Sequence, residues 1–167
     1  ADIVFWTYNW GGTPEKDRLA LIKSLPHDIT LLVTFEMYEK IRRQSICHTC
    51  VDYTISFAGP GRYFTSEAKE ARRRKIRLYT MCNTGGLTWD FGVVPYEPVP
   101  MQWARRHRAL LKANQAWGLS GLMESHHFGW WPSFVSELAK WAYWTPSIPA
   151  DRILRLIAAR DYGREAS

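Results

Sequence analysis

Four short apolar runs alternate with stretches of helical pattern along this chain, and this alternation limits its possible folds more than any other feature. Each run is nearly continuous in apolar residues and ends at a turn or loop, as buried strands do. The runs cover residues 3–8, 28–36, 76–82 and 119–124. The helical patterns cover residues 15–25, 67–75, 101–117, 132–144 and 151–161. Strand and helix in repeated succession predict an α/β fold with a parallel sheet covered by helices.

Local signals mark several helix ends and leave one region open. Thr13 before Pro14 and Ser66 are typical N-caps, while Gly118 and Gly163 are expected after helix C-termini. The segment after the second strand is less regular. Residues 37–44 are compatible with a short helix or a loop, and residues 51–57 alternate like an additional strand.

Two architectures contain such a sheet, and the spacing of the glycines after the first strand distinguishes between them. A doubly wound sheet usually carries G-x-G-x-x-G after its first strand, whereas residues 10–13 read WGGT. A (β/α)-barrel needs eight strand–helix units, so four units make half of one. We therefore expect residues 1–167 to form one partial (β/α)-barrel domain of about four strands, followed by C-terminal helices. Such a domain is a fragment of a longer one.

Composition narrows the classes of function. The chain is 46% hydrophobic with nine tryptophans, which excludes a disordered protein. Its net charge is +6, but the basic residues are interspersed with acidic ones, and the run at residues 72–75 ends a helical stretch, where cations are favoured. We therefore expect no nucleic-acid partner. No apolar run reaches the roughly 20 residues of a membrane helix, so no membrane association is expected.

The cysteines predict neither a disulfide framework nor a metal site. Cys47 and Cys50 have the Cys-x-x-Cys spacing, but no second Cys or His pair follows at zinc-finger distance. Three cysteines without a pairing pattern favour loop positions in a reducing compartment such as the cytoplasm. We expect no metal and no cofactor.

Carboxylates at strand ends are the candidate catalytic groups. Glu36 closes the second strand and Glu124 the fourth, and residues at the C-terminal ends of barrel strands point into the barrel mouth. Glycoside hydrolysis uses two carboxyl groups, one as acid and one as base or nucleophile. The alternative is that each carboxylate binds sugar hydroxyls or pairs with an arginine. Asp90, in a loop, is a third candidate, with turn formation as its alternative role.

Trp6, Tyr8 and Trp10 alternate along the first predicted strand and its exit. Other aromatic residues gather in the loops after the strands, where they can stack on the apolar faces of sugars. We predict a sugar-binding set that includes Trp6, Tyr8, Trp10, Trp89 and Trp130. This placement fits the general rule that loops carry function.

His126 and His127 follow Glu124. Adjacent residues of an extended chain point in opposite directions, so these histidines are expected to bind substrate or Glu124 and not a metal. No G-x-S-x-G motif indicates a serine hydrolase.

The end of the chain resembles the closing segment of a glycoside hydrolase barrel. The similarity lies in GLMESHHFGWWP at residues 121–132, ELAKW at 137–141 and the helical tail through residue 163. The group resembled contains the family-20 β-N-acetylhexosaminidases and the family-67 α-glucuronidases. The resemblance implies the C-terminal half of a barrel, with the last strand lining the sugar pocket. Family-20 enzymes carry an adjacent Asp-Glu pair on the fourth barrel strand, and this chain has none, which implies that the pair precedes Ala1.

Three functions follow, each with its own partner. The first is a glycoside hydrolase fragment that acts on a carbohydrate with the remaining N-terminal part of the barrel. The second is a non-catalytic carbohydrate-binding half-barrel. The third is a structural half-barrel that self-associates to cover its open sheet edges.

Overall fold

The computed structural model describes residues 2–50, 53–82, 98–124, 132–143 and 148–166. The strands are β1 (Val4–Trp6), β2 (Thr30–Thr34), β3 (Glu39–Arg43), β4 (Ile46–Cys50), β5 (Arg77–Met81) and β6 (Leu119–Met123). The helices are α1 (Glu15–Ser24), α2 (Arg62–Arg74), α3 (Pro100–Trp117), α4 (Phe134–Ala142) and α5 (Ala150–Tyr162), with 3-10 turns η1 (Tyr8–Trp10) and η2 (Arg164–Ala166). Within the described ranges, no helix combines the length and the apolar character needed to cross a bilayer.

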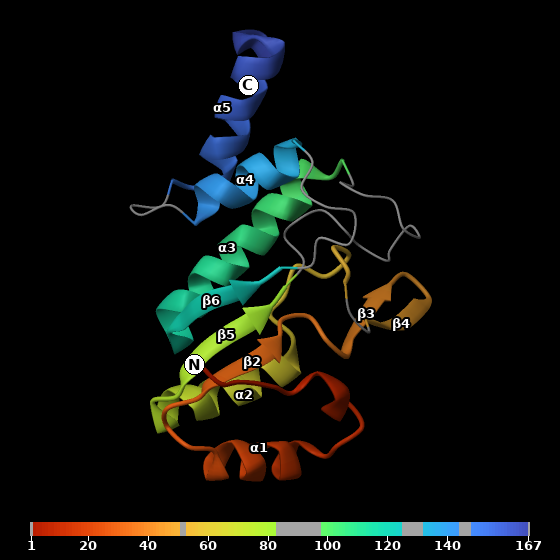
Figure 1. Ribbon diagram of the computed structural model, residues 1–167. Helices are drawn as coiled ribbons and strands as arrows, with labels where there is room; N and C mark the ends of the chain where they lie inside the picture. The colour runs from red at the N-terminus through yellow and green to blue at the C-terminus, as the bar shows by residue number, and fades with distance from the viewer. Residues whose placement is uncertain (1, 51–52, 83–97, 125–131, 144–147, 167) are drawn as a thin grey trace.

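The main sheet is parallel, and its strands stand in chain order. The strand order is β1-β2-β5-β6, so each strand pairs with the previous one of the sheet. Figure 1 shows β2, β5 and β6 side by side. The predicted α/β fold with a parallel four-stranded sheet is therefore confirmed. Crossovers between parallel strands are right-handed, so a sheet that grows in one direction receives its connecting helices on one face.

The hydrophobic core confirms this arrangement of the helices. Ile22 of α1, Phe64 of α2 and Leu110 of α3 belong to one buried cluster. The sheet contributes a row of side chains that are level with one another in the strand register and face this cluster: Phe5, Leu31, Leu78 and Leu119. Helices α1, α2 and α3 therefore cover the same face of the sheet.

The opposite face carries a second row, Trp6, Leu32, Tyr79 and Gly121, aligned across all four strands. Leu32 is buried by its neighbours, whereas Val4 and Met123, on the two outer strands, are 49% and 46% exposed. Tyr79 lies over Gly121 so closely that a Cβ at residue 121 would be 2.5 Å from its ring. The row Trp6, Leu32, Tyr79 and Gly121 is apolar, and the outer strands are accessible on this face.

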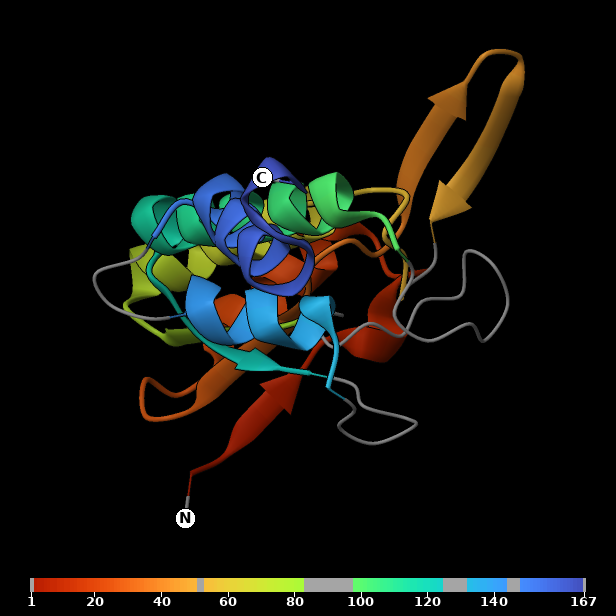
Figure 2. The same ribbon diagram turned by 90° about the horizontal axis from the view of Figure 1, so that it is seen from above.

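A two-stranded antiparallel hairpin, β3–β4, projects from the carboxyl end of β2 (Figures 1 and 2). The expectation of a helix or loop at residues 37–44 was wrong, and so was the placement of an additional strand at residues 51–57: the strand is Ile46–Cys50, and residues 53–57 form none. The tight turn has Gln44 at φ 54°, a conformation usually taken by Gly or Asn. The sequence therefore lacked the usual hairpin signal.

The helix boundaries are partly as expected. Gly118, at φ 73°, ends α3 as predicted. Helix α2 begins at Arg62, five residues before the predicted start, so Ser66 lies inside the helix and is no N-cap. Its buried side chains Phe64, Ala68 and Ala71 follow the helical spacing from the first turn onward. Packing against the sheet therefore extends this helix.

A second core joins α3 to the C-terminal helices. Trp103 of α3, Leu138 of α4 and Ile153 of α5 are buried together. Helix α4 begins with a capping box in which Ser133 and Ser136 bind each other's backbone. These contacts hold α4 and α5 against the first turns of α3 (Figure 1).

Candidate functional site at the carboxyl edge of the sheet

A polar residue follows every strand of the main sheet at its carboxyl end. Thr7 comes after β1, Glu36 after β2, Cys82 after β5 and Glu124 after β6. Because the strands are parallel and in register, these residues meet at one edge of the sheet. The predicted placement of Glu36 and Glu124 at a common edge agrees with the strand register.

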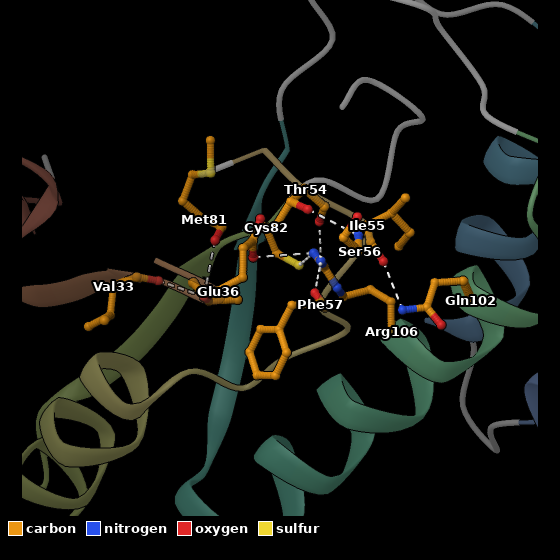
Figure 3. Close-up of polar contacts among 11 residues, drawn as sticks. Val33, Glu36, Thr54, Ile55, Ser56, Phe57, Met81, Cys82, Gln102 and Arg106 are labelled. Atoms are coloured by element: carbon orange, nitrogen blue, oxygen red, sulfur yellow. Dashed lines mark hydrogen bonds and ion pairs between the residues drawn. The ribbon is translucent and has the colours of Figure 1, made fainter. Parts of the chain in front are cut away.

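Glu36 is fully buried and belongs to a polar network around the equally buried Arg106 of α3 (Figure 3). Arg106 Nη1 is 3.2 Å from Glu36 Oε2 and 2.9 Å from Cys82 Sγ. Arg106 Nη2 donates to the carbonyl oxygens of Thr54, at 2.5 Å, and Phe57, at 2.9 Å. One guanidinium thus joins the ends of β2 and β5 to the segment between the hairpin and α2.

This burial restricts the chemistry of the network. Both Glu36 and Arg106 have fully buried side chains, so the carboxylate is held by a permanent cation inside the protein. Burial raises the pKa of the Cys82 thiol, which keeps it neutral at physiological pH. Glu36 therefore has the arginine partner that the sequence left open as the alternative to catalysis.

Glu124 is the more accessible of the two carboxylates. It is partly exposed and accepts a hydrogen bond of 3.0 Å from the hydroxyl of Tyr143, just after α4. The Tyr143 ring meets the His107 ring edge-to-face, with centroids 5.6 Å apart. Burial, with the adjacent Arg106, lowers the pKa of His107 to about 3, so this imidazole is neutral. A neutral, packed side chain thus supports the tyrosine that orients Glu124.

The three aromatic residues at the end of β1 do not form one row. Trp6 and Tyr8 are in contact, with ring centroids 4.5 Å apart and planes tilted by 36°. Trp10 instead packs edge-to-face against Phe5, at 5.5 Å. The predicted strand at residues 3–8 was too long: β1 ends at Trp6, and the 3-10 turn that follows removes the alternation. The structure therefore brings Trp6 and Tyr8 together and separates Trp10 from them.

A second buried carboxylate, Glu67 of α2, was not singled out from the sequence. Glu67 Oε2 accepts a hydrogen bond of 2.7 Å from Thr7 Oγ1, and its other oxygen pairs with Arg18 of α1. The Arg18 guanidinium also lies 3.8 Å from the centre of the Tyr63 ring. Burial raises the pKa of Glu67, although Thr7 and Arg18 act to lower it. The partners of Glu67 lie 60 and 49 residues away in the sequence, so the local sequence gave no sign of its burial.

Five predicted site residues lie outside the described ranges: Trp89, Asp90, His126, His127 and Trp130. Among the residues that are described, no group of three or more His, Cys, Asp or Glu side chains is arranged to hold a metal ion. Cys47 and Cys50 lie on β4, three residues apart, so their side chains point to opposite faces of the hairpin. Their expected loop position was wrong, and neither forms a disulfide.

Comparisons of this chain with known protein families, with curated proteins and with solved structures found no match.

Proposed function

We propose that this chain is half of a (β/α)-barrel that takes part in glycoside hydrolysis, with its site at the carboxyl edge of the sheet. The observation that supports this most directly is the strand order: the four parallel strands follow the chain, with α1, α2 and α3 on one face. A barrel half has this arrangement, and its inner face is completed by further strands. The apolar row Trp6, Leu32 and Tyr79 lies on the face that a closed barrel would enclose.

The residues of the edge divide into two roles in this proposal. Glu124 is the carboxylate that contacts the sugar, and Tyr143 orients it through the 3.0 Å hydrogen bond. The neighbouring rings of Trp6 and Tyr8 form an aromatic platform for the apolar face of a sugar ring. Glu36 and Arg106 act beneath the site and fix the ends of β2 and β5.

The second carboxyl group that hydrolysis needs comes from elsewhere in this proposal. In the family-20 enzymes that the end of this chain resembles, an adjacent Asp-Glu pair supplies the acid; within this chain, Asp90 is the candidate for the second carboxyl group. The rest of the barrel supplies the partner strands for β1 and β6, whose exposed Val4 and Met123 mark the accessible outer strands.

A non-catalytic sugar-binding role is the second candidate, and one observation favours it. Glu36, one of the two predicted catalytic carboxylates, has no exposed side-chain surface and pairs with Arg106. An edge that presents the partly exposed Glu124 and an aromatic pair is suited to binding a sugar. The third candidate, self-association, uses the same accessible outer strands.

The test is hydrolysis of aryl-glycosides by the complete reading frame. The panel contains N-acetylglucosaminide, N-acetylgalactosaminide and glucuronide. If Glu124 is an acid–base or nucleophilic group, Glu124→Gln lowers kcat by about 100-fold or more. Tyr143→Phe, which removes only the orienting hydrogen bond, lowers kcat less. The exposed Glu165→Gln serves as a matched control and leaves activity unchanged.

Each result separates the candidates. If Glu124→Gln leaves hydrolysis unchanged, the protein is a glycoside hydrolase in which Glu124 has no catalytic role. Binding of a sugar without hydrolysis, weakened by Trp6→Ala, would establish the binding module instead. Neither hydrolysis nor binding, with a concentration-dependent mass, would favour the self-associating half-barrel.

A further inference from the structure

We propose a second binding site, at the amino edge of the sheet, for a phosphate monoester that carries a flat ring, of which a nucleoside monophosphate is the simplest example. The site is a cavity of about 570 Å³, within the range of small-molecule sites in proteins. It lies where β2 and β5 begin and where α2 and α3 end, so it is separated from Glu36 and Glu124 by the length of the strands. The proposal is independent of the sugar site.

The charge of the cavity indicates an anionic ligand. Three permanent cations line it, Arg72, Lys75 and Arg77, against one carboxylate, Asp28. Within the described part of the chain, neither Arg72 nor Lys75 forms an ion pair. Arg77 has only a distant contact with Asp2, at 4.0 Å, between two largely exposed side chains. Cations gathered without carboxylate partners are the usual means of binding a phosphate.

The cations exceed what the nearby helix ends require. Helices α2 and α3 both end at this cavity, and each C-terminus carries about half a negative charge. Their last turns are already capped: Lys75 N–H donates to the Arg72 carbonyl, Ile76 N–H to that of Ala71, and Gly118 N–H to that of Asn114. The two helix ends and Asp28 together oppose about two of the three positive charges, which leaves a net positive field in the cavity.

Aromatic surface lies beside the cations. Trp117, the last residue of α3, lines the cavity and is only partly buried. It is fixed by an edge-to-face contact with Phe64 of the core, with ring centroids 5.8 Å apart. Stacking on a tryptophan favours a planar ring. The pairing of a cationic wall with an anchored indole selects a ligand with both a phosphate and a ring.

The experiment is calorimetric titration of the full chain with adenosine monophosphate, ribose 5-phosphate, inorganic phosphate and adenosine. We expect adenosine monophosphate to bind about fivefold or more tightly than ribose 5-phosphate, because only it can stack. In the pocket variant Arg72→Gln/Lys75→Gln, the affinity for adenosine monophosphate falls at least about tenfold. The control variant Lys40→Gln/Arg42→Gln removes the same charge from exposed positions of the β3–β4 hairpin and leaves the affinity within twofold.

Three results would overturn the proposal. Equal weakening in the pocket and control variants would indicate general attraction to a basic protein. Equal affinity for inorganic phosphate and adenosine monophosphate would show that the ring contributes nothing to binding. If the chain is folded, as circular dichroism would show, and binds none of these ligands, the proposed site does not exist. None of these results bears on the hydrolysis of glycosides.

Discussion

Arg106 and Glu36 form an ion pair at the carboxyl edge of the sheet, with 3.2 Å between Nη1 and Oε2 and with both side chains fully buried. Seventy residues separate them in sequence. The same guanidinium donates to two backbone carbonyls, of Thr54 and Phe57. A charge removed from water in this way is tolerated because several partners satisfy it, so the contribution of each partner can be measured by substitution.

Removal of the cation leaves Glu36 as an uncompensated buried charge. We expect Arg106→Met to lower the free energy of unfolding by about 3–5 kcal/mol, as measured by urea denaturation. The double variant Arg106→Met/Glu36→Leu recovers part of this loss, because it removes the stranded carboxylate as well. The neighbouring exposed Arg105→Met changes stability by no more than about 0.5 kcal/mol. Equal effects of the two single substitutions would contradict the buried ion pair.

His107 makes stability dependent on pH below neutrality. Its pKa is lowered from 6.5 to about 3 in the folded protein, by burial and by Arg106. The unfolded chain therefore takes up a proton near pH 6.5, whereas the folded protein does not. The stabilisation is present above pH 6.5 and is lost as the pH falls toward 3. Between pH 7 and pH 5 this one group lowers the free energy of unfolding by about 2 kcal/mol.

The measurement compares urea denaturation of the parent and of His107→Leu at both pH values. We expect the parent to lose about 2 kcal/mol more than the variant over this interval. His48→Gln, on the exposed face of the hairpin, should keep the full pH dependence of the parent. An identical pH dependence in His107→Leu and the parent would show that this histidine titrates normally.

Glu67 has the opposite pH dependence. Burial raises its pKa in the folded protein above the ordinary value of 4.5, against the effects of Thr7 and Arg18. The stability that goes with the raised pKa is fully present below pH 4.5 and is lost as the pH rises through the folded pKa. Because glutamine does not titrate, Glu67→Gln should reduce the free energy of unfolding more at pH 4 than at pH 7. A greater loss at pH 7 would instead mean that the ion pair with Arg18 outweighs burial.

Gly121 is required by the close approach of Tyr79 on the neighbouring strand. An added Cβ would be 2.5 Å from the tyrosine ring, so Gly121→Ala should lower the free energy of unfolding by about 1–3 kcal/mol. Gly12→Ala is the matched control, since no atom lies within 4 Å of a Cβ there. Thermal denaturation measures both. Equal losses of unfolding free energy in Gly121→Ala and Gly12→Ala would show that Tyr79 can move away from residue 121 at no cost in stability.

The strands and most helices could be predicted because their signals are local. The continuous apolar run around β2 and the glycine after α3 are features of a few consecutive residues. The hairpin could not be predicted, because its strands are mostly polar and its turn places Gln44 in the left-handed region. The start of α2 depends on contacts of Phe64 with the sheet core, which no local pattern contains.

The candidate site was predictable only in part, for a related reason. A parallel sheet brings its strand ends together, so Glu36 and Glu124 could be placed at one edge from the strand pattern alone. Whether a carboxylate is exposed depends on distant partners. Glu36 finds its partner in α3, and Glu67 finds partners 49 and 60 residues away. In the sequence, such charges look the same as those of a solvated helix face.

The order β1-β2-β5-β6 also has a consequence for how the protein is made. A chain is synthesised from its N-terminus, and structure can form as it emerges. Each new strand of this sheet finds its neighbour already synthesised, so the sheet can grow in step with translation. Arg106 emerges after Glu36, Thr54, Phe57 and Cys82, and its guanidinium joins them only then. The buried ion pair can therefore form only after the first three strands of the sheet have been synthesised and are able to pair.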